Sequence, residues 1–374
     1  MSSPIIQEIP FTADSESLFA RFRHLPGAVW LDSGKPRSLQ GRFDLISALP
    51  QTTLQSSGGT VTIRENRGDG TTSSEQTIDG DPFGIAWQHL QSRGMYGKEF
   101  AHIPFCGGLI GYFNYDLGES RANIRRQESS TPPDMVLGWY GWGIVVNHQS
   151  NKSWLVIHPA CSDATVSKVK ALVAEPSCEP QPSKFQLETP FTCDVSKDRY
   201  LGAIARIKDY LHSGDCYQAN FAIPHRARYR GDCWEAYKML RRSSPTPYGA
   251  YLSWEGKSIL CCSPERFIKV SVGKVETKPI KGTIARGNTL DDDQENAVQL
   301  LNSKKDRAEN LMIVDLLRND IGKVATAGSV SVPKLFDIES FPAVHHLVST
   351  ITATLKPSLN ASDLLRSCFP GGSI

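Results

Sequence analysis

Two helical patterns, set among segments that alternate like β-strands, most constrain how this chain folds. Apolar residues recur every three or four positions in Leu201–Leu211, after Ser196 as a helix cap and before Gly214 as a stop. A second helical pattern covers residues 303–318, and the polar segment 319–322 is expected to end it. The chain is therefore not an all-β protein, although most of its other apolar runs are short.

The remaining apolar segments are typical of strands, apart from a short helix expected at Cys233–Arg242. The expected strands are Val29–Leu31, Trp154–Ile157, Cys216–Tyr229, Tyr248–Trp254, Ser258–Cys262, Phe267–Val272, Val330–Phe336 and Leu347–Leu355. The three strands between residues 248 and 272 are expected to form an antiparallel meander. Because helices and strands follow one another without regular βαβ alternation, the sequence predicts an α+β fold, with layered antiparallel β-sheets and helices outside.

The length of 374 residues allows one large domain or two ordinary ones. Three prolines interrupt any periodic element in Glu175–Ser183, which favours a linker there. We therefore expect an N-terminal domain at residues 1–185 and a second domain at residues 186–374. The stretch Gln51–Gly80 is rich in Thr, Ser, Gly and charge, so exposed hairpins or loops are expected there.

Charge and cysteine content exclude several classes of protein. The formal net charge is +2, and no block of basic residues is present, which argues against nucleic-acid binding. The first residues lack the basic and apolar regions of a signal peptide, and no membrane span is found. The nine cysteines form no C-x-x-C pair, and Cys261 and Cys262 are adjacent. This usage indicates a reducing, cytoplasmic location and argues against structural zinc.

Lys281 is the first candidate for chemistry, since it stands in Pro279-Ile280-Lys281-Gly282-Thr283, where proline and glycine hold the backbone. An amine is a nucleophile only when it is neutral, and a free lysine has a pKa of about 10.4. Desolvation, a metal ion or a cation such as Lys278 would have to lower that pKa for Lys281 to react near neutrality. A solvated lysine on a hairpin is the alternative.

Glu265 and one of two adjacent histidines are candidates for acid–base roles. Glu265 follows Pro264 at the head of an expected strand, and apolar neighbours could raise its pKa; an ordinary ion pair is the alternative. His345 and His346 are consecutive in a strand, so only one of them can face a given pocket. A single strand histidine is more often structural than catalytic.

Carboxylates on the second helix are candidates for metal binding. Asp306, Glu309 and Asp315 are expected along one side of that helix. Oxygen ligands of this kind suit Mg²⁺, which takes one or two protein carboxylates and completes its shell with water and substrate oxygens. Lysines and arginines between residues 304 and 318 make a salt-bridged helix face an equal alternative.

Two glycine-rich segments remain. Gly107–Phe113 has the wrong spacing for a dinucleotide fingerprint, and close packing of backbone against backbone is favoured there over ligand contact. Phe369–Ile374 is a glycine turn that carries a hydroxyl, and such turns can present backbone N–H groups to an anion.

Together these motifs resemble the aminodeoxychorismate synthase component I family of chorismate-utilising enzymes, over essentially the whole sequence. The motif Asp306–Leu316 is highly specific to such enzymes, and Gly107–Asp116 matches their N-terminal domain. The other matching segments are Ser213–Asn220, Ser263–Phe267, Pro279–Thr283, Lys305–Gly322, Phe341–Thr350 and Phe369–Ile374. The resemblance implies a fold like that of anthranilate synthase component I.

Two positions distinguish this sequence from similar families. Anthranilate synthase component I generally has alanine where this chain has Lys281, and isochorismate and salicylate synthases have a water-activating lysine where it has Gln218. The resemblance therefore implies amination of chorismate at C4, with Gln218 and Thr283 on the substrate side. Anthranilate synthase component I and a non-catalytic binding subunit are the alternatives.

The resemblance also implies roles for the candidate residues. Lys281 attacks the chorismate ring at C2 as the C4 hydroxyl leaves, Glu265 protonates that hydroxyl, and ammonia then displaces the lysine. His346 orients the leaving-group side of the ring, and Glu309 ligates Mg²⁺, which holds a substrate carboxylate. Ammonia comes from a separate glutaminase, component II, so a heterodimer is implied.

The family further implies a bound L-tryptophan in the N-terminal domain. The matching residues are Ser33, Gln40, Gly41, Arg42, Phe43, Pro247, Tyr248 and Gly249. Gln40 and Gly249 replace a tyrosine and a serine that are common in relatives, which favours a structural over a regulatory tryptophan and leaves its absence open.

The family motif normally continues past Ile374 with Thr-Gly-Ala-Pro-Lys and a further helix-and-strand segment. That segment supplies a second Mg²⁺ ligand and groups that hold the substrate carboxylates. We therefore expect the catalytic domain in this sequence to be incomplete, truncated at its C-terminus, and to have poor activity by itself.

Overall fold

The computed structural model describes residues 3–35, 41–118, 132–174 and 183–373. The chain divides into two compact units, of which the first combines Met1–Glu179 with Leu240–Ser373 and the second is essentially Pro180–Met239. These units do not coincide with the division expected at residue 185, which stays a prediction. Except for its last residue, the expected linker lies outside the described residues.

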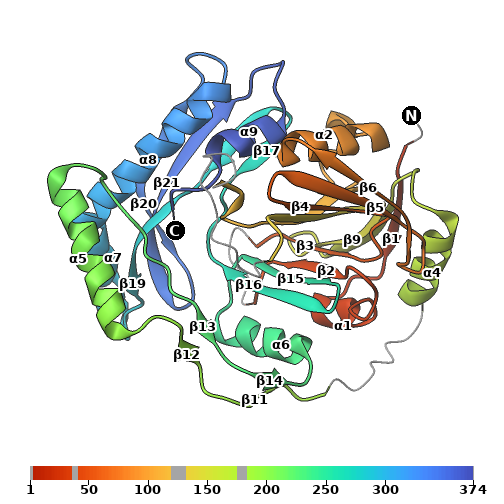
Figure 1. Cartoon of the computed structure of the whole chain (residues 1–374), viewed down its shortest axis with the longest axis horizontal. Helices are drawn as coiled ribbons and strands as arrows, with labels where there is room; N and C mark the ends of the chain where they lie inside the picture. The colour runs from red at the N-terminus through yellow and green to blue at the C-terminus, as the bar shows by residue number, and fades with distance from the viewer. Residues whose placement is uncertain (1–2, 36–40, 119–131, 175–182, 374) are drawn as a thin grey trace. The chain divides into compact units, whose positions relative to one another are not determined.

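A seven-stranded antiparallel sheet is the largest in the described part of the first unit (Figure 1). It joins strands that are far apart in the sequence, because β2 (Val29–Asp32) pairs with β15 (Tyr248–Trp254). The strands expected around Trp30 and Trp154 are confirmed. In spatial order the sheet contains β1 (Ile5–Ile9), β10 (Lys152–Ile157), β9 (Trp142–Asn147), β3 (Phe43–Ser47), β2 (Val29–Asp32), β15 (Tyr248–Trp254) and β16 (Lys257–Ser263).

A second antiparallel sheet carries the hairpins expected in Gln51–Gly80. Its order is β6 (Thr72–Asp79), β5 (Thr60–Asn66), β4 (Thr52–Ser57), β8 (Met135–Tyr140) and β7 (Gly108–Phe113). A Cβ on Gly111 would lie 1.9 Å from the Val136 carbonyl oxygen, so close backbone packing explains this glycine. Val29 and Leu252 of the first sheet share a buried core with Ile110 and Tyr140 of the second.

A third sheet holds the C-terminal strands of the first unit. Its order is β17 (Lys269–Ser271), β18 (Lys274–Thr277), β21 (Val344–Thr354) and β19 (Ile280–Ala285), and β20 (Ser331–Ser340) also pairs with β21. The expected meander is therefore only partly right: β15 and β16 pair, but β17 pairs with β18 in this other sheet. The chain leaves the first sheet after Ser263, where Pro264 cannot donate a ladder hydrogen bond.

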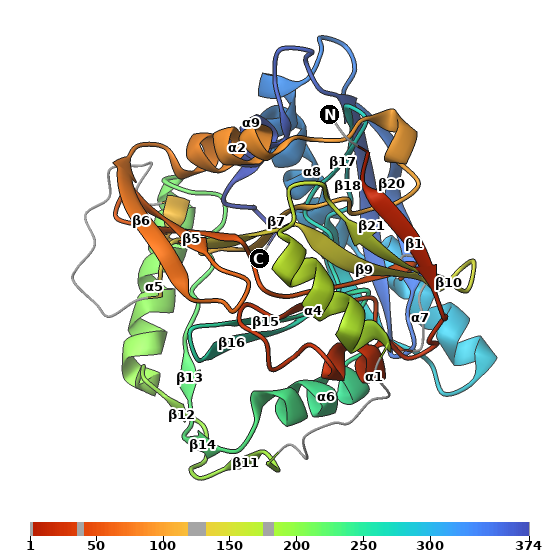
Figure 2. The ribbon, with the colours of Figure 1, turned by 90° about the vertical axis from the view of Figure 1, so that its right-hand side faces the viewer.

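Helix α8 (Lys304–Val324) packs on the third sheet, as Figures 1 and 2 show. Its residues Ile313, Leu317 and Ile321 share a core with Ile351 of β21. The predicted end at residues 319–322 is wrong, because Ile321 and Val324 are buried there and burial outweighs the roughly 1 kcal/mol cost of an interior glycine. The preceding helix α7 (Leu290–Asn302) was not predicted.

The other helices of the first unit are short. Helices α2 and α9 lie side by side (Figure 2), and the Ser362 hydroxyl donates to the Phe83 carbonyl oxygen at 2.6 Å. No helix in the described ranges has the length and apolar character needed to cross a membrane. The short helices of the first unit are α1 (Ser15–Ala20), α2 (Pro82–Arg93), the 3-10 turn η1 (Lys98–Phe100), α4 (Asp163–Ala174) and α9 (Ala361–Cys368).

The second unit is built around α5 (Lys197–Ser213). The Ser196 hydroxyl accepts from the Arg199 backbone N–H, and Gly214 is left-handed at φ 82°, so both predicted ends are confirmed. Helix α6 (Cys233–Ser243), also predicted, crosses from the second unit into the first.

The strand predicted at Cys216–Tyr229 is wrong. A strand needs a partner, and in this unit only two-residue segments are paired among the described residues. They are β11 (Gln186–Leu187) with β14 (Tyr229–Arg230), and β12 (Thr192–Cys193) with β13 (His225–Arg226).

Candidate active site

Glu265 lies in the loop that leaves β16, beside the start of β19. Its Oε2 accepts a hydrogen bond from the Ser373 hydroxyl at 3.1 Å, and that hydroxyl also contacts the Ile280 carbonyl oxygen at 3.3 Å. Burial raises the pKa of Glu265, although Ser373, the Ile280 backbone and the charge of Lys281 oppose the shift. This carboxyl therefore holds its proton to a higher pH than an exposed glutamate does, as a general acid requires.

Lys281 lies at an irregularity in β19. The register with β21 shifts between Ile280 and Thr283, so the strand has a β-bulge in the stretch that contains Lys281. Gly282 adopts φ 98°, and a Cβ there would lie 2.8 Å from the Cβ of Asp306. Glycine therefore allows both the bulge and the close approach of α8. The bulge places the Lys281 amine where its charge acts on Glu265.

His346 sits opposite Thr283 in the β19–β21 register. The Thr283 hydroxyl lies 2.8 Å from Nδ1 of the imidazole, and the ring of Phe341 packs edge-on against it at 5.3 Å. Burial lowers the pKa of His346, although the charge of Glu339 and a bond to the Gly282 backbone oppose this. This shift favours the neutral imidazole, and His346 lies on the same pair of strands as Lys281.

His345 has different partners, as expected for neighbouring residues in a strand. Its Nδ1 lies 2.8 Å from the Ser340 hydroxyl, and its Nε2 lies 3.0 Å from Asp293. Arg286 donates to the Asp293 carboxylate and holds its pKa below the ordinary range. His345 is therefore part of a structural network, and His346 is the histidine beside Thr283.

The α8 carboxylates separate into different environments. Asp306 accepts from the Ser303 hydroxyl at the start of the helix, and Asp315 pairs with Arg318 at 2.8 Å. The expectation that these two share one side of the helix is wrong, because nine residues amount to about two and a half turns. Glu309 contacts Lys305 at 3.8 Å.

Glu309 remains the α8 carboxylate that best fits Mg²⁺. Its side chain is 39% exposed and its lysine partner is 82% exposed, so the ion pair is weak and the oxygens are open to a cation. No group of three or more His, Cys, Asp or Glu side chains in the described ranges could hold a metal ion. A single protein carboxylate is compatible with Mg²⁺, which relies on water and substrate oxygens.

A buried amide fixes α8 against β21. Asn310 is fully buried, its Nδ2 donates to the Leu347 carbonyl oxygen at 3.1 Å, and its Oδ1 accepts from the Ser349 hydroxyl at 2.6 Å. This amide lies next to Glu309 in the sequence, so the network sets the position of that carboxylate relative to β21.

Gln218 lies in the second unit, in the exposed segment after α5. Its expected place on the substrate side stays a prediction.

The residues expected to bind tryptophan lie on neighbouring strands or directly beside their ends, except for Gln40, which lies outside the described residues. Ser33 follows β2, whose residue Asp32 pairs with Gly249 of β15. The guanidinium of Arg42 stacks 4.6 Å from the ring of Phe43, on the other neighbour of β2. The side chain of Ser33 is buried and bonded to Asp44. Tryptophan binding stays a prediction, as does the part that Gly41, Pro247 and Tyr248 take in it.

Sequence reasoning missed the contact between Ser373 and Glu265. The two residues are 108 positions apart, and no periodicity connects them. The one signal in the sequence is the hydroxyl in the Phe369–Ile374 turn, a turn that predicts backbone N–H groups presented to an anion. The ion pair between Lys278, which lies just before β19, and Glu339 of β20 was also not predicted.

Comparison with known proteins identifies the family. The model for chorismate binding enzymes matches residues 47–374 of this sequence. The chain belongs to the chorismate binding enzyme family.

Individual relatives agree with this assignment. The chain is 42% identical over 376 residues to aminodeoxychorismate synthase component 1 of Escherichia coli strain K12, covering all of this chain and 80% of that protein. It is 41% identical over 380 residues to the protein of the same name from Klebsiella aerogenes, covering 81% of that protein.

Anthranilate synthase component I from Streptococcus pneumoniae TIGR4 is a solved structure with the same fold. It aligns with a TM-score of 0.75 and 26% identity, over 90% of this chain and 74% of that one. The predicted fold class and its likeness to anthranilate synthase component I are confirmed.

Proposed function

We propose that this chain is the chorismate-using component of an aminodeoxychorismate synthase, which converts chorismate and ammonia to 4-amino-4-deoxychorismate for 4-aminobenzoate and folate synthesis. The relatives at 41% and 42% identity carry this name. The observation that carries the proposal is the juxtaposition of Lys281, on its bulge, with Glu265, whose pKa burial raises. One group supplies a nucleophile and the other a proton, as a substitution at an allylic alcohol requires.

In the first step the Lys281 amine forms a bond to C2 of chorismate. Both conjugated double bonds of the ring shift, and the C4 hydroxyl leaves as water with the proton of Glu265. A general acid of this kind contributes about 10²–10⁴ in rate. The product of the step is a protonated secondary amine that links Lys281 to the ring.

In the second step ammonia adds at C4 and both ring double bonds shift back. The bond between Lys281 and C2 breaks, the lysine leaves as the neutral amine, and 4-amino-4-deoxychorismate remains with its new amino group protonated. Two allylic displacements thus replace one direct substitution. His346 and Thr283, joined at 2.8 Å, orient the C4 side of the ring, and Gln218 contributes from the substrate side.

Glu309 is the residue that we propose for Mg²⁺, with Asn310 fixing its helix turn. The bound cation would supply positive charge to a carboxylate of the substrate.

A component 1 works with a second component, and we propose that this partner is a glutaminase that supplies ammonia in a heterodimer. We also propose a cytoplasmic location, which the free cysteines among the described residues support. A tryptophan bound at Ser33 and Gly249 is proposed as a structural ligand.

Product analysis tests this function. The protein is incubated with chorismate, ammonium and Mg²⁺, and the products are identified by liquid chromatography with mass spectrometry. We expect 4-amino-4-deoxychorismate from the unmodified protein and none from Lys281→Ala. Lys281→Arg is the matched control, because it keeps the positive charge but not the nucleophile.

Anthranilate synthase is the second candidate, because its component I has the same fold. It aminates at C2 and releases pyruvate, so a fluorescent aromatic product would identify it. Failure to form any aminated product, with the glutaminase partner present, would instead favour a binding subunit and contradict the proposal.

A further inference from the structure

Asp293 lies in the first turn of α7, and its carboxylate collects hydrogen-bond donors from two other segments of the first unit. Arg286, which follows β19, donates to both carboxylate oxygens at 2.6 Å, from Nε and from Nη2. The backbone N–H of Gly287 donates at 2.8 Å, and Nε2 of His345 on β21 lies at 3.0 Å. A carboxylate with this many donors serves as an anchor rather than as a base.

The start of α7 is fixed closely against the end of β19, the strand that carries Lys281. A Cβ on Gly287 would lie 2.1 Å from the backbone nitrogen of Asp293, so a glycine is needed for the two segments to pass at this distance. One turn further along α7, Nδ2 of Asn296 donates to the Ala285 carbonyl oxygen at 3.1 Å. The position of Asp293 relative to β19 is therefore set by backbone contacts as well as by side chains.

Arg286 also holds the turn between β20 and β21. Its Nη1 donates to the Phe341 carbonyl oxygen at 3.0 Å, and its backbone N–H donates to the Ala343 carbonyl oxygen at 3.1 Å. Within the turn, the Phe341 N–H donates to the Val344 carbonyl oxygen at 2.8 Å. Because Asp293 binds the same planar guanidinium through two parallel hydrogen bonds, this carboxylate fixes the direction in which Arg286 meets the turn.

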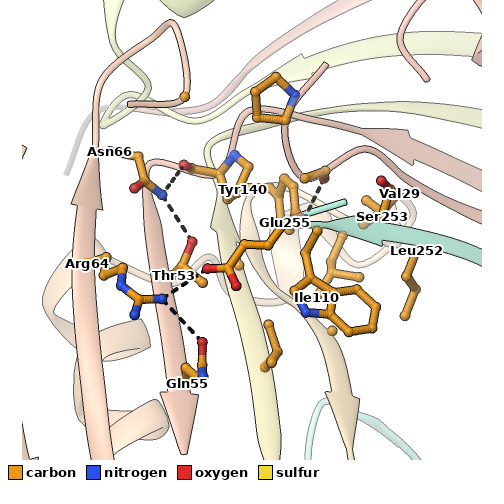
Figure 3. A pocket seen from close by; sticks show the side chains of 18 of the residues that line it. Val29, Thr53, Gln55, Arg64, Asn66, Ile110, Tyr140, Leu252, Ser253 and Glu255 are labelled. Carbon is orange, nitrogen blue, oxygen red and sulfur yellow. Dashed lines mark hydrogen bonds and ion pairs between the residues drawn. The ribbon is translucent and has the colours of Figure 1, made fainter. Parts of the chain in front are cut away.

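A second arginine of the first unit shows that such a cluster need not hold the backbone. Figure 3 shows Arg64 at a cavity of about 180 Å³, where it contacts Glu255 at 3.1 Å and Gln55 at 3.2 Å. Its guanidinium also pairs with Glu75 at 2.6 Å, so these bonds join side chains, and Glu255 is 59% exposed. Ion pairs of this exposed kind contribute little, whereas the cluster of Arg286 bonds to the main chain of a turn beside the candidate site.

The turn that Arg286 holds places the ring of Phe341 against the imidazole of His346. Phe341 is buried, and its ring lies edge-on to the imidazole with 5.3 Å between centroids. The Thr283 hydroxyl lies 2.8 Å from Nδ1 of that imidazole. The hydrogen bond fixes Nδ1, and the aromatic edge limits rotation of the ring. The orientation of the imidazole thus depends on the turn, and through the turn on Arg286 and Asp293.

We propose that Asp293 is a positioning residue for the amination of chorismate. Together with Arg286 it fixes the turn that contains Phe341, and the turn sets the orientation in which His346 meets the C4 side of the substrate ring. This inference rests on the proposed function, in which His346 orients that side of the ring. Because Asp293 acts through the imidazole, its loss should lower kcat and leave the KM for chorismate nearly unchanged.

A double-mutant cycle tests whether Asp293 acts through His346. The kcat of amination, with ammonium in excess, is measured for the unmodified protein, Asp293→Ala, His346→Ala and the double variant. We expect Asp293→Ala to lower kcat about tenfold when His346 is present, and less than about twofold in the His346→Ala background. An equal fold-reduction in both backgrounds, or none when His346 is present, would overturn the proposal.

Two control variants separate positioning from a general loss of charge. Asp291→Ala removes the same charge from the same first turn of α7, at an exposed position, and should leave kcat unchanged. Glu255→Ala takes a carboxylate from Arg64 and should also leave kcat unchanged. A reduction in Asp291→Ala as large as that in Asp293→Ala would assign the effect to the charge of the helix start and overturn the proposal.

A spectroscopic measurement keeps the test independent of catalysis. The protein is labelled with ¹³C in its histidine rings, and the His346 resonance is assigned by its absence from the spectrum of His346→Ala. We expect this resonance to move in Asp293→Ala and to stay in place in Asp291→Ala. Arg286→Lys keeps the charge without the bidentate geometry, so it should move the resonance too and replaces Asp293→Ala if that variant does not fold.

The two measurements distinguish failure of this inference from failure of the proposed function. If the unmodified protein forms no 4-amino-4-deoxychorismate, the proposed function fails, and the His346 resonance still decides whether Asp293 fixes the imidazole. A resonance that stays in place in both Asp293→Ala and Arg286→Lys would overturn the positioning role, whatever the protein produces from chorismate.

Discussion

Asp44 and Glu265 are carboxyl groups of the same unit with opposite surroundings. Asp44 is fully buried, and three side chains of the described residues bond to it. The hydroxyl of Ser15 donates at 2.5 Å, the hydroxyl and N–H of Ser33 donate at 2.5 Å and 2.9 Å, and Nε2 of His148 lies at 2.8 Å. A carboxylate with this many partners joins four segments of the chain and has little capacity left for chemistry.

Glu265 has fewer hydrogen-bond partners than Asp44, and its proton takes part in the proposed reaction. In the part of the chain that the structure describes, only the Ser373 hydroxyl and the Ile280 backbone oppose the effect of burial by hydrogen bonding, and the pKa of Glu265 rises despite them. The difference teaches that the number of donors around a buried carboxyl separates an anchor of the fold from a group able to transfer a proton.

Glu265→Gln should have the largest effect on catalysis. We expect the rate of chorismate amination to fall by about 10²–10⁴, because the amide cannot protonate the leaving hydroxyl. The melting temperature should change little, since glutamine can still accept from Ser373. Glu75→Gln, on the exposed strand β6, is the matched control. A rate within about threefold of the unmodified protein would remove Glu265 from the mechanism.

Asp44→Ala should show the opposite profile. It leaves the donors of Ser15 and Ser33 buried without a partner, so we expect the free energy of unfolding to fall by about 3 kcal/mol. The amination rate per folded molecule should stay within about twofold. Chemical denaturation measures the first quantity and steady-state kinetics the second. Asp79→Ala on exposed β6 is the control, with a loss of less than about 1 kcal/mol.

The sequence predicts those features of the structure that depend on neighbouring residues. Helix α5 was predicted with both of its ends, because Ser196 and Gly214 act on their immediate neighbours. The end of α8 was missed because burial of Ile321 depends on β21, which no local pattern reveals.

The candidate site shows the same limit. Lys281, Glu265 and His346 were identified from motifs, but the hydroxyl that contacts Glu265 comes from a residue 108 positions away. Gly282 was the only sign in the sequence of the bulge at Lys281. The raised pKa of Glu265 also follows from tertiary burial, which sequence reasoning could state only as a condition.

The pH dependence of amination sharpens the comparison further. In the proposed mechanism the acid form of Glu265 is the active one, so we expect the rate to fall about tenfold per pH unit above its raised pKa. Glu265→Gln should abolish this alkaline limb. A limb that persists unchanged in Glu265→Gln would belong to another group.

The raised pKa of Glu265 also determines the direction in which the stability of the fold changes with pH. Because the folded pKa of Glu265 exceeds the unfolded value of about 4.3, its contribution to stability is fully present below that value. The contribution is lost as the pH rises through the folded pKa. Denaturation of the unmodified protein and of Glu265→Gln across this range measures the difference.

Ser373→Ala should have the smallest effect. The Ser373 hydroxyl stabilises the ionised form of Glu265, so its removal should raise the pKa of Glu265 and move the alkaline limb to higher pH. We expect a change of only a few-fold in the plateau rate, as for the loss of one hydrogen bond worth about 1 kcal/mol. Ser243→Ala, whose hydroxyl bonds to its own helix, is the control. A limb that moves to lower pH would contradict the assignment.

The most direct test of the central claim is mass spectrometry of the protein after incubation with chorismate and Mg²⁺ in the absence of ammonia. The account predicts an adduct of chorismate less one water, located on Lys281 by peptide mapping, absent from Lys281→Arg, and released as 4-amino-4-deoxychorismate when ammonium is added. Amination that proceeds at the full rate in Lys281→Ala, with no adduct on the unmodified protein, would contradict it.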